Sequence, residues 1–271
     1  MVNWPHYPFA AYRESKPAAG VITALVGISL IAWIVQSKKI HFRPRRPQIL
    51  ILISHITMLI QLILRAAFSK RTNDSKGAFT ALSVLLSISL RTVILANYDF
   101  LTQVHKLKTW ITRTIIIGSV VLGITSAVLM APAGSLSYDP DKVDTSFQLR
   151  QASSAIVLGM TVLFYPVWFL TKTIKHMTRY AFILLIISSF ACLIVGVYLV
   201  IISVPEYYTK SNEKELWVYI FQIVPNVIAL FAWSILHPRR SLKQTEPSKE
   251  PSKEEEETKT KIDDSVQIVR L

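Results

Sequence analysis

The sequence predicts an all-α fold, a bundle of seven transmembrane helices with the amino terminus outside and the carboxy terminus in the cytosol. Hydrophobic residues make up 51% of the chain and charged residues only 17%. The apolar residues fall in seven long runs, and none of the runs alternates in polarity as the strands of a membrane barrel do. Because every backbone amide in lipid must be paired within its own segment, runs of this length are expected to form helices.

Each run approaches or exceeds the roughly 20 mostly apolar residues that a membrane span needs. The runs cover residues 18–36, 48–67, 78–98, 114–131, 152–170, 180–204 and 216–236. The first follows Pro17 and ends without a small-residue cleavage motif, so we expect a retained helix and not a signal peptide. The second, third, sixth and seventh also carry polar side chains on one face, whereas length and apolarity alone define the fourth and fifth. The sixth holds Cys192, the only cysteine, which excludes an intrachain disulfide.

The distribution of the net charge of +13 predicts the orientation. The connections at 37–47, 99–113 and 171–179, together with the stretch 237–243, contain fourteen Lys and Arg. The segments on the opposite side contain nine, mixed with eight acidic residues. Basic residues beside membrane spans stay in the cytosol, so the odd-numbered loops are predicted to face inward. The same residues would attract anionic lipid head groups, which explains the basic charge better than nucleic-acid binding does.

Three segments follow from this map: a short extracellular segment at 1–17, a membrane domain at 18–240 and a charged cytosolic tail at 241–271. The tail contains the imperfect repeat EPSKEPSKEEEE and has no apolar face. Such a composition cannot bury enough surface to offset the entropy of ordering, so the tail is predicted to be disordered. It could serve only to keep the protein soluble, or it could be a platform for phosphorylation or ubiquitination.

Four spans carry polar residues at helical spacing. They are Ser54, Thr57, Gln61 and Arg65 in the second span, Thr80, Ser87, Arg91 and Tyr98 in the third, Ser189, Cys192, Gly196 and Ser203 in the sixth, and Glu215, Tyr219, Gln222, Asn226 and Trp233 in the seventh. Polar groups avoid lipid, so these faces are expected to point inward and to enclose a cavity for an amphiphile. The alternative is ordinary helix packing, in which small and hydroxyl residues let helices approach closely.

Arg91 is the most informative single residue, because its guanidinium lies deep in the third span. It could reach the membrane surface by snorkelling, or it could meet a partner or an anionic ligand group inside the bundle. Arg65 lies closer to its helix end, where snorkelling is easier. Pro225 lies between Gln222 and Asn226 and leaves a backbone carbonyl unpaired one turn earlier, a feature found beside binding sites and hinges.

The sequence lacks the residues that several known activities of seven-span proteins require. The seventh run contains no lysine for a retinal Schiff base, and the histidines are scattered, with only His55 inside a span. No phosphate-binding glycine loop or nucleophile elbow is present, and the Asp-Arg-Tyr and Asn-Pro-x-x-Tyr motifs of rhodopsin-type receptors are absent. We therefore expect a protein that is not an enzyme and needs no cofactor or metal.

The last quarter of the membrane domain resembles the fungal RTA-like lipid-translocating exporters. The stretch ELWVYIFQIVP from Glu215 to Pro225, followed by His237-Pro238, is similar to the Glu-Trp-x-x-Tyr-x-x-Asp-x-x-Pro and His-Pro-Gly of that family. Arg65 falls where the family ends its Glu-x-x-Gly-Tyr-x-x-Arg, and Tyr98 falls at a Tyr-containing end of the third span. The spacing of the spans agrees over about residues 7–240.

The chain departs from the family at most charged signature positions. Met58 and Gln61-Leu62 replace the family's Glu and Gly-Tyr, Gln222 replaces its Asp, and Val195, Leu199 and Ile202 replace the Arg-x-x-x-Arg-x-x-Glu of the sixth span. The resemblance therefore implies a divergent member or a neighbouring fungal family.

By this resemblance the protein would move a lipid or amphiphile of the sphingoid-base or sterol-like class, without ATP hydrolysis of its own. We expect it in the plasma membrane, with an internal membrane as the alternative. A seven-span receptor that signals through its basic loops and a non-transporting scaffold or regulator are the alternatives. The expected partners are membrane lipids and a small amphiphile, and no nucleic acid. The candidate binding residues are Arg91, Tyr98, Arg65, Gln61, Tyr219, Gln222, Pro225, Asn226 and Glu215.

Overall fold

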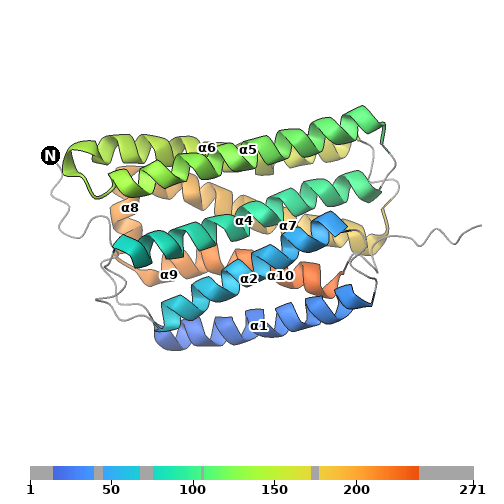
Figure 1. Ribbon diagram of the computed structural model, residues 1–271, viewed down its shortest axis with the longest axis horizontal. Coiled ribbons are helices and arrows are strands. Elements are labelled where there is room, and N and C mark those ends of the chain that lie inside the picture. The colour runs from blue at the N-terminus through green and yellow to red at the C-terminus, as the bar shows by residue number, and fades with distance from the viewer. Residues whose placement is uncertain (1–14, 40–44, 68–75, 105–106, 172–176, 238–271) are drawn as a thin grey trace, which may run out of the picture.

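The computed structural model describes residues 15–39, 45–67, 76–104, 107–171 and 177–237, and every regular element in these ranges is helical. Seven helices are long and apolar enough to cross a membrane, which confirms the predicted seven-helix bundle of a multi-pass membrane protein. They run side by side along the long axis of the molecule (Figure 1). The sidedness of the bundle stays a prediction, and the charged tail lies outside the described residues.

Six spans are single helices, and the seventh consists of three consecutive segments. The six are α1 (Lys16–Lys38), α2 (Arg45–Ala67), α4 (Lys76–Val104), α5 (Thr109–Leu136), α6 (Val143–Leu170) and α7 (Arg179–Ile202). The seventh span comprises α9 (Glu215–Val218), the π-helical segment η3 (Tyr219–Ile223) and α10 (Val224–Ile235). Two short elements lie between spans, the 3-10 turn η1 (Pro140–Lys142) and the helix α8 (Pro205–Asn212).

Several helices extend beyond the predicted apolar runs, α6 most clearly, since it begins at Val143 and not near residue 152. The apolar run marks only the part of a helix that is immersed in hydrocarbon, whereas helical hydrogen bonding continues into the polar region. A helix of 28 residues is about 42 Å long at about 1.5 Å per residue, compared with a hydrocarbon core of about 30 Å. This extension brings Arg150 into the helix.

Each long helix packs against the preceding one, and α10 packs against both α7 and α1, so the bundle closes on itself. Helix α4 lies at its centre and contacts α2, α5, α6, α7 and α10. The outer surface is apolar, with Val21, Ile31 and Val128 each more than half exposed. Only 17% of the most apolar part of α5 is buried within the protein, compared with 61% for the seventh span. Most of α5 therefore faces lipid, and the seventh span is largely enclosed by protein.

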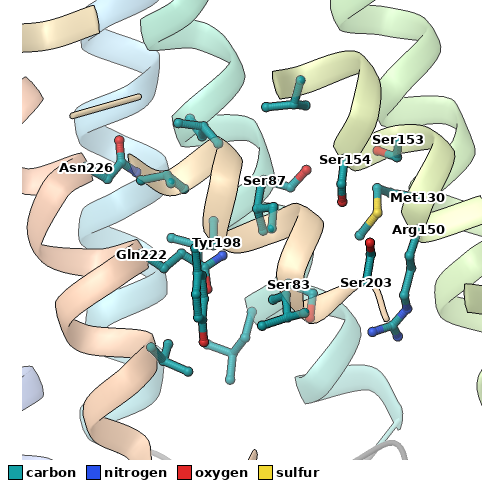
Figure 2. A pocket seen from close by; sticks show the side chains of 18 of the residues that line it. Ser83, Ser87, Met130, Arg150, Ser153, Ser154, Tyr198, Ser203, Gln222 and Asn226 are labelled. Carbon is teal, nitrogen blue, oxygen red and sulfur yellow. The ribbon is translucent and has the colours of Figure 1, made fainter. Parts of the chain in front are cut away.

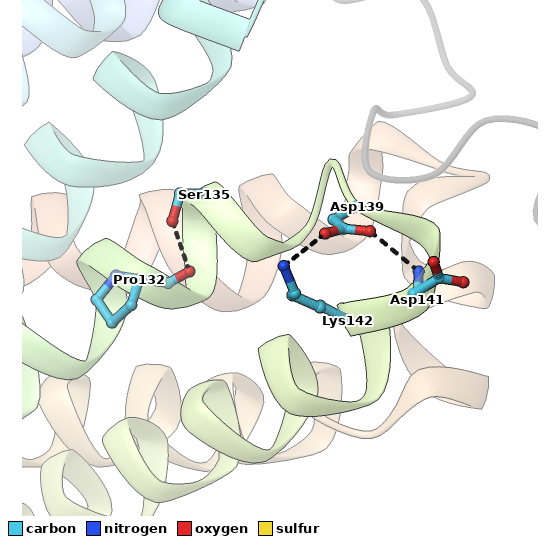
Figure 3. Close-up of polar contacts among 5 residues, drawn as sticks. All are labelled: Pro132, Ser135, Asp139, Asp141 and Lys142. Carbon is cyan, nitrogen blue, oxygen red and sulfur yellow. Dashed lines mark hydrogen bonds and ion pairs between the residues drawn. The ribbon is translucent and has the colours of Figure 1, made fainter.

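The turn between α5 and α6 is fixed by one carboxylate (Figure 3). Asp139 accepts a hydrogen bond from the Asp141 amide at 3.2 Å and forms an ion pair with Lys142 at 2.9 Å. The hydrogen bond from Lys142, followed by that from the Asp141 amide, holds the pKa of the Asp139 carboxyl below its ordinary value. Polar contacts of Asp139 therefore hold the turn that joins α5 to α6, and the neighbouring Tyr138 ring packs edge-on against Phe79 of α4, with ring centres 6.4 Å apart.

The seventh span departs from the single helix that the sequence predicted. Pro225 cannot donate a backbone hydrogen bond, and the preceding residues Tyr219–Ile223 form a π-helical turn. A π-turn of this kind is uncommon and is frequently found at functional sites. At the start of the same span, both carboxylate oxygens of Glu215 accept the backbone amide of Ser15 at 2.9 Å, which joins the first span to the last.

Candidate functional site

A cavity of about 200 Å³ lies in the half of the bundle that contains α8 and the α5–α6 turn. Three arginines line it, Arg65 from α2, Arg91 from α4 and Arg150 from α6, and we call it the arginine cavity. Serines from α4, α6 and α8, and Ser203 directly after α7, supply much of the remaining polar lining. Figure 2 shows Tyr198 and Gln222 on one side of this space, with Ser154, Ser203 and Arg150 on the other.

The guanidinium of Arg91 is buried and its donors are occupied by neutral acceptors. Nε donates to the Ser126 hydroxyl at 2.8 Å, and Nη2 donates to the Ser126 carbonyl at 3.2 Å and to the Ser153 hydroxyl at 2.9 Å. Nη1 donates to the carbonyl and the hydroxyl of Ser87. Arg91 therefore does not snorkel, and it is held inward against α5 and α6.

These contacts satisfy the hydrogen bonds of Arg91 without neutralising its charge. No Asp or Glu is among the described residues that line the cavity, and the ion pairs found in the described ranges do not involve Arg91. Serine hydroxyls carry only dipoles, so they reduce the cost of burying the cation but cannot cancel its field. The cavity consequently has a positive potential in a region of low dielectric constant.

Arg150 is only half-buried and is less fully bonded than Arg91. Its Nη2 donates to the Ser137 hydroxyl at 3.0 Å, while its buried Nε has no hydrogen-bond partner. The guanidinium carbon lies 5.2 Å from the ring centre of Tyr208 in α8 and 5.9 Å from that of Phe147. Cation–π contacts of this kind orient a guanidinium without occupying its donors. Arg150 is thus placed where it can still donate to a ligand.

Arg65 is the third arginine that lines the cavity, and it contacts the π-helical segment of the seventh span. Its guanidinium carbon lies 5.9 Å from the ring centre of Tyr219, the first residue of the π-helical turn. Gln222, from the same turn, and Asn226, one turn further on, also line the cavity. Asn226 donates to the Ser89 hydroxyl at 3.0 Å, and its buried carbonyl oxygen has no hydrogen-bond partner.

An apolar groove of about 600 Å³ runs beside the cavity on the outer flank of the bundle. Side chains from α7, α8 and the start of the seventh span line it, among them the partly exposed Val197, Ile201 and Trp217. Tyr198, Ile202 and Ser211 line both the groove and the cavity. The Tyr198 and Ser211 hydroxyls are 2.6 Å apart. A wall of three residues therefore separates the charged interior from the apolar flank.

Five of the predicted binding residues do not line the cavity. The Tyr98 hydroxyl donates to the Met160 carbonyl at 2.7 Å, Glu215 binds the start of α1, and Pro225 is buried in the seventh span. Tyr219 lies behind Arg65. Gln61 is fully buried, and neither its amide nitrogen nor its amide oxygen has a hydrogen-bond partner. Arg65, Arg91, Gln222 and Asn226 do line the cavity, and their role in binding stays a prediction.

The cavity also draws on the fourth and fifth spans, which the sequence reasoning omitted. Met130 comes from α5, and Arg150, Ser153 and Ser154 come from α6. A signal for these residues exists, because Ser146, Arg150 and Ser153 recur at offsets of four and three along one helical face. The apolar run itself begins at residue 152, so hydrophobicity alone places Arg150 in a loop.

Comparisons with models of known protein families, with curated proteins and with solved structures find no match. The resemblance to the RTA-like exporters therefore stays a prediction. Within the described ranges, no three His, Cys, Asp or Glu side chains gather where they could hold a metal ion. The positive charge of the cavity and the apolar surface of the groove are suited to binding an anion and an apolar chain.

Proposed function

We propose that the protein binds a lipid or another amphiphile from the membrane and moves it, without hydrolysing ATP, as a divergent relative of the RTA-like exporters. One observation carries the proposal: a polar, charged cavity inside a membrane bundle shares a wall with an apolar groove on the lipid-facing flank. An amphiphile has a polar head and an apolar chain, so it matches both surfaces at once. A soluble polar solute would use only the first.

The dimensions agree with this division. Small-molecule pockets usually enclose roughly 300–1,000 Å³, so a cavity of about 200 Å³ fits a head group and not a whole lipid. The groove of about 600 Å³ has room for part of a hydrocarbon chain. The π-helical turn before Pro225 adjoins the cavity through Gln222, which gives the seventh span a point at which it can bend during transport.

The test is lipid movement in vesicles that contain the purified full-length chain. Lipids labelled on the head-group side, with anionic, zwitterionic and cationic heads, are followed by their accessibility to an impermeant quencher. We expect movement of at least one head-group class above that of empty vesicles. We also expect Ser154→Leu, which fills the cavity from α6, to abolish it.

Gly159→Leu is the matched control, because it adds the same side chain to the same helix at a position with no atom within 4 Å of the added Cβ. It should leave the movement unchanged. The proposal of transport fails if no head-group class moves, or if Ser154→Leu and Gly159→Leu behave alike. Binding of a lipid without movement would favour the receptor reading.

A further inference from the structure

We infer that the arginine cavity selects amphiphiles whose head group is an anion, such as a phosphate or a carboxylate, with the hydrocarbon chain lying in the adjoining groove. The inference rests on the proposed function, since it names the class of ligand for the same site. It concerns the charge of the ligand, which the sequence reasoning left open and which the resemblance assigned to cationic sphingoid bases among others.

The first step is the charge of the cavity. Arg91 and Arg150 both line it, and neither forms an ion pair with an acidic residue of the described ranges. The described lining contains no Asp or Glu that could receive a cationic head. Charges interact more strongly where water is scarce. An ammonium group would therefore be repelled from this space, and an anion would be attracted to it.

The second step is that Arg91 and Arg150 have different roles in the cavity. The donors of Arg91 are taken up by Ser87, Ser126 and Ser153, so this residue acts mainly through its fixed positive charge. The one hydrogen bond found for Arg150 in the described residues runs from Nη2 to the Ser137 hydroxyl, so its remaining donors are available to a ligand. Guanidinium groups bind carboxylates and phosphates through paired N–H donors. Arg150 is consequently the residue that we expect to touch the head group.

The third step is the place of the chain. The wall shared by the two spaces consists of Tyr198, Ile202 and Ser211. Two of these residues are held together by one hydrogen bond of 2.6 Å between hydroxyls, which a rotation of either side chain would break. The groove beyond them is bounded mainly by apolar side chains and aromatic rings, and by Lys210, which is paired with Glu206. A chain attached to a head group near Arg150 can therefore leave the bundle sideways, into lipid.

The decisive experiment is a binding competition on the purified full-length chain in neutral detergent micelles. The probes are a single-chain phosphate monoester (a lysophosphatidate), the corresponding phosphocholine and a single-chain amine, all of equal chain length. Inorganic phosphate is the fourth. We expect the phosphate monoester to bind at least tenfold more tightly than the amine and the phosphocholine, and inorganic phosphate to compete only weakly.

Variants then test which residue carries the preference. Arg150→Gln should weaken binding of the phosphate monoester roughly tenfold to a hundredfold, the usual worth of a charge-assisted contact, and leave amine binding unchanged or improved. Arg150→Lys should be intermediate, because a point charge replaces the planar fork. Arg113→Gln removes an exposed arginine at the start of α5, outside the cavity, and should have no effect.

The outcomes separate this inference from the proposed function. If all three amphiphiles bind equally, or the amine binds best, the inference is overturned while amphiphile binding stands. If inorganic phosphate competes as well as the phosphate monoester, the groove plays no part and the assignment of the chain is overturned. If Arg150→Gln keeps the anion preference in a protein with wild-type thermal stability, the role of Arg150 is overturned. If no amphiphile binds, the proposed function itself fails.

Discussion

Two of the buried polar clusters in the described part of the bundle differ in whether any space is left between their side chains. At the end where α10 finishes, Ser29, His55 and Ser234 bind one another. The Ser29 hydroxyl lies 2.8 Å from that of Ser234 and 3.1 Å from His55 Nε2, and His55 Nδ1 bonds the Ile51 carbonyl at 2.9 Å. We call this group the closed cluster. In the other half, the polar groups of the arginine cavity border an open space of about 200 Å³.

Aromatic packing explains why the first cluster is closed. Trp33 stacks on His55 with ring centres 6.2 Å apart, and Trp33 meets Trp233 edge-on at 6.3 Å. Both tryptophans are fully buried. Large rings on α1 and α10 thus fill the room around a few small polar groups, whereas serines supply much of the polar lining of the cavity. Polar side chains in a span indicate a binding site only where the surrounding residues are too small to fill the space.

The largest effect is expected in a labelling test of which side of the membrane the cavity faces, because each introduced cysteine either reacts or does not react in intact cells. The charge distribution predicts that the cavity half faces outward. Cysteine introduced by Asp139→Cys, in the turn beside the cavity, should react with an impermeant thiol reagent in intact cells. Cysteine placed at position 43 should react only after permeabilisation. Cys192 is buried and should remain unlabelled in both proteins. The opposite pattern would place the cavity on the cytosolic side.

Truncating a large side chain in the half of the bundle that contains the closed cluster should lower the free energy of unfolding. Trp233 is fully buried, donates to the Ser188 hydroxyl at 3.1 Å and packs on Phe100. Trp233→Ala should cost about 3–5 kcal/mol without changing the head-group preference. Reaction of the single buried Cys192 with a thiol-reactive dye during heating reports the unfolding. Trp110→Ala, at an exposed site, is the control, and an equal loss in both variants would contradict the comparison.

Truncating a side chain that lines the arginine cavity should instead lower the affinity for the anionic probe. Arg91→Gln loses several hydrogen bonds but also removes a buried charge that costs about 2.5–3.5 kcal/mol near the centre of a span. We expect the free energy of unfolding to change by about 1 kcal/mol or less. Affinity for the anionic probe should fall several-fold, less than in Arg150→Gln. A stability loss as large as that of Trp233→Ala would show that Arg91 mainly stabilises the fold. It would contradict the proposed difference between the closed cluster and the arginine cavity.

The smallest effect is expected outside both clusters, in the exposed turn at Asp139. The pKa of this carboxyl is lowered in the folded protein by Lys142 and by the Asp141 amide. Its stabilisation is therefore present above the ordinary value of 3.8 and is lost as the pH falls through the lower, folded value. Asp139→Asn should remove this small part of the acid dependence of Tm. A changed anion preference in this variant would link the turn to the cavity.

Part of the candidate site could be predicted from the sequence. Arg65, Arg91, Gln222 and Asn226 were expected to point inward and do line the cavity, because polar groups avoid lipid whatever their neighbours are. The same rule failed to separate Gln61 and Tyr98 from them. Both are buried, but Gln61 has no hydrogen-bond partner, whereas the Tyr98 hydroxyl donates to the Met160 carbonyl. Burial follows from the solvent, whereas the contact made depends on how adjacent helices are rotated.

The sequence by itself determined the number of spans, their order and, for four of them, the face that turns away from lipid, because hydrophobicity and backbone pairing are local properties of each segment. Thr80 is an exception, since it belongs to a predicted inward face and is exposed. Only the tertiary structure decided that α6 contributes Arg150, that α8 and the π-helical turn border the same space, and that serines and not rings surround Arg91. These features require helices distant in the chain to meet at particular heights and rotations, and no single segment encodes such a meeting.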